Sequence, residues 1–175
     1  AGRTSDFRRY GEQDPRGVDV GGWGLNITTE DIAQFGQLYL QHGKWNNVQL
    51  IRPDWVSSAT SKQVANAPNA NVDWEQGYGY QFWRCRHNAY RGDGAFGQYC
   101  IVLPDQDAVL AITSGLPDMQ AVLNLVWDTL LPGFSAGALP ADNGANDALR
   151  LRLAELHMPL ARGAYTSPLA GKVLG

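Results

Sequence analysis

The chain has 175 residues, a mass of 19.1 kDa and a formal charge of −3, with 14 Lys and Arg against 17 Asp and Glu. A chain of this length can form one domain with a buried core and needs no disulfides to fold. The slightly acidic charge, without any run of basic residues, argues against nucleic-acid binding, and no apolar stretch approaches the roughly 20 residues that a membrane span needs.

The first predicted helix follows an irregular lead-in that covers residues 1–22. Thr28 and Asp31 have the spacing of a capping box in which Asp replaces the usual Glu or Gln. Gly43 stands at the expected C′ position, where a left-handed residue belongs, so the helix is expected to end near Gln41. Its apolar residues fall on one face: Ile32, Phe35, Leu38 and Tyr39.

Residues 45–76 are predicted to contain a tight turn, a short helix and a loop. The turn falls at 45–48, where two adjacent Asn residues are typical of such a turn. The helix opens at Pro53, because proline is tolerated in a first helical turn. Residues 61–76 are polar and rich in Asn, so this segment is expected to be a loop.

From Tyr78 onward the hydrophobic period changes to two and the aromatic content rises. Four strands are predicted, at residues 78–86, 89–95, 98–103 and 108–113. The breaks between them are only a few residues long, and such short connections join antiparallel neighbours. The simplest arrangement is therefore an antiparallel meander.

A further helix is predicted from Asp118, a favourable N-cap, to Leu131, before Pro132 and Gly133 end it. Four of its side chains are expected to face inward: Val122, Leu125, Val126 and Leu130. Helices on one face of an antiparallel sheet define an α+β fold. The expected domain covers residues 1–132.

The composition changes after residue 132. Residues 133–146 are rich in Gly, Ala and Pro and are interpreted as a linker. Within residues 147–175, which are interpreted as the start of a further, truncated module, residues 147–157 can form a short amphipathic helix.

Cofactor and metal motifs are not supported by their context. Residues 92–97 match GxGxxG, but a strand follows them instead of the helix that a dinucleotide site needs, so no cofactor is expected. No CxxC or HxxxH spacing supports a metal site. Cys85 and Cys100 fall on strands that a third strand separates, which puts their Cα atoms at least about 9.5 Å apart and predicts free thiols.

Gly92 and Gly94 interrupt the second predicted strand, and Gly97 lies in the break between the second and third strands. Glycine weakens a strand and often marks a place where a ligand approaches the backbone closely. A bulged edge strand would also explain these residues. The residues alone leave both interpretations open.

Four segments, taken in order, resemble the C-terminal half of the beta-lactamase-like serine hydrolases. They are WGLNITTEDIAQFGQLYL at 23–40, IRPDWV at 51–56, GYGYQFW at 77–83 and GDGAFGQY at 92–99. The family includes class C beta-lactamases, penicillin-binding-protein-like D-alanyl carboxypeptidases, related esterases and 6-aminohexanoate-dimer hydrolases. The resemblance covers about residues 7–132.

The resemblance implies an acyl-enzyme mechanism with a SxxK nucleophile pair, a YxN general-base motif and a [KH]xG strand. No Ser in this chain has Lys three residues on and no Tyr has Asn two residues on, so nucleophile and base are expected in a missing N-terminal half. The third motif is matched by Gly92, Asp93 and Gly94, with Gly in place of Lys or His. The implied site consists of the Ala95 backbone N–H as an oxyanion donor and Gly92, Asp93, Gly94 and Phe96 as substrate-binding residues.

The implied reaction is hydrolysis of an amide, ester or beta-lactam bond in a small-molecule or peptide-like substrate, in a bacterial protein. Because Arg91 should point to the opposite face from Gly92, no cation is expected at the motif, which favours substrates without a free carboxylate. The alternative is a non-catalytic ligand-binding module of the same fold. The chain alone is expected to be inactive and to self-associate or to pair with its missing half through exposed apolar surface.

Overall fold

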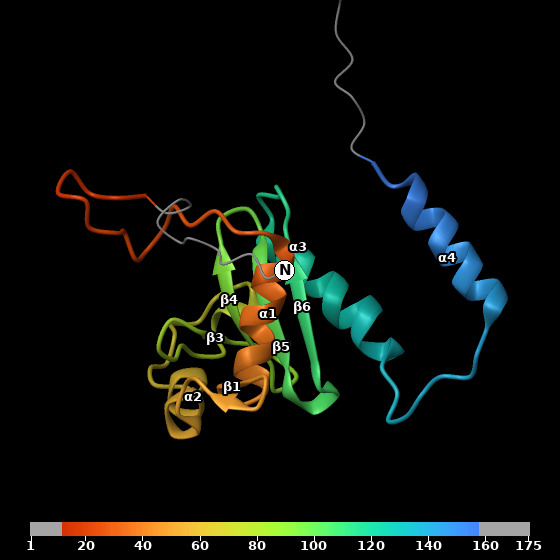
Figure 1. Ribbon diagram of the computed structural model, residues 1–175, viewed down its shortest axis with the longest axis horizontal. Helices are drawn as coiled ribbons and strands as arrows, with labels where there is room; N and C mark the ends of the chain where they lie inside the picture. Colours follow the sequence, from red (N-terminus) through yellow and green to blue (C-terminus); the bar gives the residue numbers. More distant parts are fainter. Residues whose placement is uncertain (1–11, 158–175) are drawn as a thin grey trace, which may run out of the picture. The chain divides into compact units, whose positions relative to one another are not determined.

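The computed structural model describes residues 12–157, and Figure 1 shows their arrangement as a ribbon. The chain divides into two compact units on either side of residue 136. The first holds a four-stranded sheet with its helices, and the second holds the helix α4. Within the described residues, no helix is both long and apolar enough to cross a membrane.

The sheet is an antiparallel meander in the order β3-β4-β5-β6, as predicted. Its strands are β3 (Trp83–Arg84), β4 (Tyr90–Gly94), β5 (Gln98–Leu103) and β6 (Ala108–Ile112). Left-handed residues form the two tight turns, His87 with Asn88 and Phe96 with Gly97. The first strand is much shorter than the predicted 78–86, because Gln81 has a φ of 67° and breaks the extended backbone before Trp83.

Helices cover both faces of the sheet, so the prediction of helices on one face is wrong. Helices α1 (Thr29–Leu40) and α2 (Pro53–Thr60) pack on the face that contains Val102, and α3 (Met119–Leu125) packs on the face that contains Ile101. Figure 1 shows α1 lying across the sheet. β5 is apolar at successive positions, which is the pattern of a strand that is buried on both sides.

Both ends of α1 follow from local sequence. The backbone N–H of Asp31 donates to Thr28 Oγ1 (3.2 Å), and the N–H of Thr28 donates to the Asp31 carboxylate (3.2 Å), which confirms the capping box. At the other end, His42 and not Gly43 is the left-handed C′ residue, with a φ of 52°. Gly43 takes the next position, where its N–H donates to the carbonyl of Leu38 (2.7 Å) in a Schellman motif.

Gly36 allows α1 to lie close to the sheet, and its replacement by Ala is expected to lower the free energy of unfolding by about 1–2 kcal/mol. A Cβ at Gly36 would lie 2.5 Å from Val109 Cγ1 and 2.8 Å from Cys100 Sγ, and this overpacking outweighs the roughly 1 kcal/mol that Ala gains in helix propensity. Gly92→Ala is the matched control, since its Cβ would meet nothing within 4 Å. Equal stability of the two variants in urea unfolding would contradict the close contact.

The remaining elements of the first unit are short. A hairpin joins β1 (Lys44–Trp45) to β2 (Val48–Gln49) through two left-handed Asn residues, which confirms the predicted turn. Single 3-10 turns lie at Val72–Trp74, inside the predicted loop 61–76, and at Pro104–Gln106.

The helix α3 continues as a π-helical turn over Val126–Leu130 and a 3-10 turn over Leu131–Gly133. Its buried side chains are Val122, Leu123, Val126 and Trp127, whereas Leu125 and Leu130 are exposed, which corrects their predicted inward position. Leu125 lies outside the helical stripe that Val122, Leu123 and Val126 define. The π turn then changes the angular spacing of the side chains that follow it.

In the second unit, α4 spans Asn143–Glu155, and Asp142 caps it by accepting a hydrogen bond from the N–H of Ala145 (2.9 Å). The helix therefore begins four residues before the predicted residue 147. Its leucines at 149, 151 and 153 are all exposed; Leu149 and Leu153 share one face of the helix, whereas Leu151 lies on the other side. Residues 158–175 of the predicted further module lie outside the described residues.

Candidate functional site

The end of β4 forms an incomplete edge of the sheet. β3 pairs only with Tyr90 and Arg91, whereas Gly92, Asp93 and Gly94 pair with β5 alone. Within the described residues, no strand therefore covers the outer side of these three residues. A strand edge of this kind leaves backbone N–H and C=O groups able to meet another molecule.

The glycines of β4 face the α1 side of the sheet. Strand alternation puts Gly92 and Gly94 on this side and Arg91 and Asp93 on the opposite side. A Cβ built on Gly92 would meet nothing within 4 Å. At Gly92 the motif thus presents bare backbone to open space, whereas a Cβ at Gly94 would lie 3.3 Å from Gln98 Cβ.

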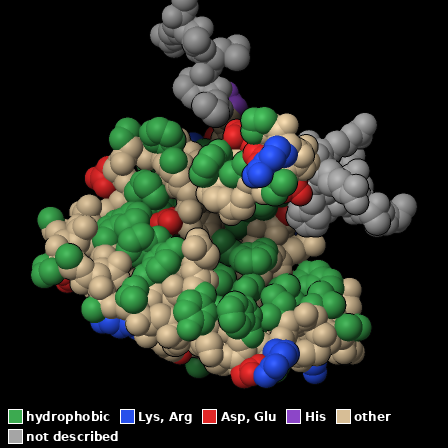
Figure 2. Space-filling model, turned by 90° about the vertical axis from the view of Figure 1, so that its left-hand side faces the viewer, with side chains coloured by type: hydrophobic (Ala, Val, Ile, Leu, Met, Phe, Trp, Pro, Cys, Tyr) green, Lys and Arg blue, Asp and Glu red, His purple; other side chains and the backbone are tan. Residues whose placement is uncertain are grey.

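That open space is a cavity of about 770 Å³ between α1 and the β4–β5 pair. Its walls come from α1, from the preceding segment and from the β1–β2 hairpin, and they include Ile27, Phe35 and Trp45. Phe35, which belongs to the apolar face of α1, is 45% exposed there. Figure 2 shows a face of the protein on which hydrophobic side chains gather around a hollow.

The turn that follows β4 is held by the loop after β6. Ser114 Oγ lies 2.7 Å from the carbonyl oxygen of Phe96 and 3.0 Å from that of Gly97, so it donates to this pair of acceptors. The N–H of Leu116 also donates to the Phe96 carbonyl (3.0 Å). Gly97 is left-handed, and a Cβ there would lie 2.4 Å from Ser114 Oγ. The backbone of residues 95–97 is therefore fixed on the side away from the cavity.

Arg91 is buried on the far side of β4, as strand alternation predicts. Its guanidinium lies over the ring of Trp74, 4.5 Å from the centroid, and its Nε is 3.3 Å from the carboxylate of Asp93. Burial raises the pKa of Asp93, and the charge of Arg91 partly offsets this effect. The pair holds the end of β4 in place, and the cation of Arg91 does not face the cavity.

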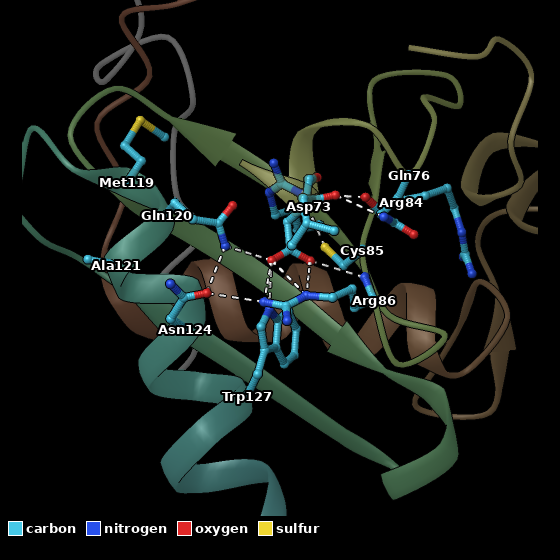
Figure 3. A network of polar contacts seen from close by, with 12 residues as sticks. Asp73, Gln76, Arg84, Cys85, Arg86, Met119, Gln120, Ala121, Asn124 and Trp127 are labelled. Carbon is cyan, nitrogen blue, oxygen red and sulfur yellow. Dashed lines mark hydrogen bonds and ion pairs between the residues drawn. The ribbon is translucent and has the colours of Figure 1, made fainter. Parts of the chain in front are cut away.

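A second polar cluster surrounds Asp73, which is fully buried (Figure 3). Its carboxylate accepts hydrogen bonds from Arg86 Nη2 (3.0 Å), Gln120 Nε2 (2.7 Å) and Trp127 Nε1 (3.0 Å). Burial by itself would raise the pKa of Asp73, but these hydrogen bonds outweigh it and hold the pKa below the ordinary value of 3.8. The cluster ties the loop before β3 to α3.

Both cysteines are free and buried, as predicted. Burial raises the pKa of Cys85 and of Cys100 to about 11. Both thiols therefore stay protonated and weakly nucleophilic at neutral pH. No group of three His, Cys, Asp or Glu side chains suited to a metal ion occurs among residues 12–157.

Three of the five residues that the sequence assigned to a site, Gly92, Asp93 and Gly94, line the cavity. Ala95 and Phe96 lie in the turn beyond it, and Phe96 is 59% exposed. Ser114 and Asp73 are not among the residues predicted from the sequence. Neither lies in a recognisable motif, and both act through residues that are distant in the chain.

No model of a known protein family matches the sequence, and no curated protein matches it. Among solved structures, the chain resembles a Bacillus anthracis protein assigned as a 6-aminohexanoate-dimer hydrolase, with a TM-score of 0.51 and 22% sequence identity. The match covers 68% of this chain and 31% of that protein, so the chain spans less than a third of its length.

This likeness establishes the fold. The first unit is α+β, with a four-stranded antiparallel sheet and flanking helices that correspond to part of a beta-lactamase-like fold. The expected fold class is thereby confirmed.

Proposed function

We propose that this chain forms one wall of the active site of a serine hydrolase that cleaves an amide, ester or beta-lactam bond. The observation that carries the proposal is the position of Gly92 and Gly94, which present bare backbone to a cavity within a beta-lactamase-like fold. The SxxK nucleophile and the YxN base, which this chain lacks, would be contributed by an N-terminal segment of a longer protein.

The backbone N–H of Ala95 is the proposed oxyanion donor. In the acylation step, the serine Oγ attacks the substrate carbonyl and the base takes the serine proton. The carbonyl oxygen then carries the negative charge of the tetrahedral intermediate. A fixed N–H donor stabilises that charge. Ser114 and Leu116 support this role because they hold the turn that contains Ala95.

Gly92, Asp93, Gly94 and Phe96 are the proposed substrate-binding residues. The first of them replaces the Lys or His that would supply a positive charge to the family's strand motif. Arg91 does not take over that role, because its side chain is buried on the other side of β4. An ester or amide without a free carboxylate therefore fits this site better than a penicillin-type substrate.

The 175-residue chain alone is expected to hydrolyse a chromogenic ester and a chromogenic cephalosporin only at the background rate. Without the nucleophile, a site of this kind retains only the contributions of binding and of the oxyanion donor. Turnover that a serine-directed acylating agent abolishes would contradict this expectation, since it would place the nucleophile within these residues.

We also propose that the apolar surface of the segment just before α1 pairs with the missing N-terminal half or, in its absence, with a second copy of the chain. Trp23 is 68% exposed and Leu25 is 54% exposed, more than an isolated domain favours for neighbouring large apolar side chains. Light scattering should show a concentration-dependent increase in mass. A strict monomer at high concentration would count against the pairing.

The replacement of Lys or His by Gly92 also favours a second candidate, a non-catalytic ligand-binding module of the same fold. The two candidates differ in the sequence that precedes Ala1 in the native gene product. SxxK and YxN motifs there support the hydrolase, and their absence supports the binding module.

A further inference from the structure

We propose that the cavity between α1 and β4 binds an apolar, uncharged acyl chain and selects against acyl groups that carry a carboxylate. The inference rests on the proposed hydrolase function, because it assigns the substrate class of the same site. It can nevertheless be tested by binding alone, without a nucleophile.

The floor of the cavity leaves room for a ligand. Gly92 and Gly94 contribute no side chains, and the space above Gly92 is empty to at least 4 Å from the position of a Cβ. A volume of about 770 Å³ lies within the range of roughly 300–1,000 Å³ that is usual for small-molecule pockets. An acyl chain that lies along this floor would have its carbonyl near the end of β4, where Ala95 follows.

The walls are aliphatic and aromatic. They include Ile27, Ile32, Phe35, Leu38, Trp45 and Leu50. Each methylene group that leaves water for such surroundings strengthens binding by about fourfold. A chain of several methylene groups would therefore bind by apolar contact alone.

Charge at the cavity selects between acyl chains of the same length. Asp31 and Asp93 are the charged residues of its lining, but the side chain of Asp93 points to the other side of β4, so the charged side chain on the α1 side is the acidic Asp31. Arg91, the cationic side chain of β4, is paired with Asp93, and its guanidinium lies over the ring of Trp74 on the other side of the sheet. A carboxylate in the cavity would meet like charge and find no cation among these lining side chains, whereas a neutral amide would meet no such repulsion.

The test compares octanamide with octanoate, which differ in charge and share an apolar chain. Both are titrated into the isotopically labelled 175-residue chain at neutral pH. The backbone amide signals of Gly92, Gly94 and Cys100 report binding. We expect saturable shifts with octanamide and a dissociation constant about tenfold higher for octanoate, the effect of roughly 1.4 kcal/mol of charge repulsion.

The variant Gly92→Leu fills the floor of the cavity and is expected to abolish octanamide binding. The matched control is Gly115→Leu, because Gly115 is exposed, has open space around its Cβ position and lies outside the cavity lining. Thermal melting of both variants verifies that each is folded. We expect the Gly115→Leu control to bind octanamide with the affinity of the wild type.

Four outcomes would overturn the inference: no saturable shift with octanamide, shifts spread over the whole surface, equal affinity for octanoate, or undiminished binding by Gly92→Leu. Failure of the proposed function looks different. In that case octanamide binds at Gly92 as expected, but the longer native protein hydrolyses no ester or amide.

Discussion

The replacement Asp73→Asn is expected to lower the free energy of unfolding by about 3 kcal/mol. The substitution keeps the side-chain volume, but it places an amide NH₂ against the Gln120 and Trp127 N–H groups. In the wild type, these groups donate hydrogen bonds to the carboxylate. Removing one partner of a buried charge pair costs roughly 3–5 kcal/mol. The lower end applies here because the side chain of Arg86, at 32% exposed, remains partly hydrated when it loses its partner.

Chemical unfolding in urea, followed by circular dichroism, measures this change. Asp128→Asn is the matched control, since Asp128 lies on the exposed side of the same helical segment and should change stability by less than about 0.5 kcal/mol. If Asp73→Asn lowers the free energy of unfolding by no more than the control does, the buried cluster contributes little to stability.

The same cluster makes stability depend on pH in a defined direction. The pKa of Asp73 is lower in the folded chain than its ordinary value of 3.8, so the unfolded chain takes up a proton first as the pH falls. The stabilisation is therefore present above about pH 4 and is lost as the pH falls through the lower pKa of the folded state. Asp73→Asn should remove this part of the acid dependence.

The largest catalytic effect is expected from Ala95→Pro in the longer native protein, which should lower kcat by about 10²–10³-fold with little change in KM. Proline has no backbone N–H, and removal of one oxyanion donor costs roughly this factor. Ala95→Gly keeps the N–H and should retain activity close to that of the wild type.

Steady-state hydrolysis of a chromogenic ester measures both parameters, and thermal melting shows whether Ala95→Pro keeps the fold. Equal activity of a folded Ala95→Pro variant and the wild type would remove Ala95 from the proposed site. A loss of activity by Ala95→Gly as large as that of Ala95→Pro would point to the side chain instead of the N–H.

The sheet was predictable because its signals are local. Period-two alternation and turn residues at positions 87–88 and 96–97 define an antiparallel meander without knowledge of distant contacts. The helices were predicted, but their packing on both faces of the sheet was not, because the pattern of elements does not say on which face a helix packs. The continuous apolar run of β5 carried that information.

The site was predictable only in part. Interrupting glycines and the family resemblance marked Gly92 and Gly94, which do line a cavity. The burial of Asp73 could not be foreseen, since it lies in a polar loop and its partners Gln120 and Trp127 are 47 and 54 residues away. Ser114 is likewise 18 residues from the turn that it holds. Such long-range polar contacts leave no periodic signal.

The central claim is that these residues are the sheet wall of a serine hydrolase whose nucleophile lies upstream. The most direct test is the intact mass and peptide map of the native gene product after treatment with a serine-directed acylating agent. The account predicts one acyl adduct, on the serine of a SxxK motif that precedes Ala1. An unmodified native protein, or an adduct on a serine within these 175 residues, would contradict it.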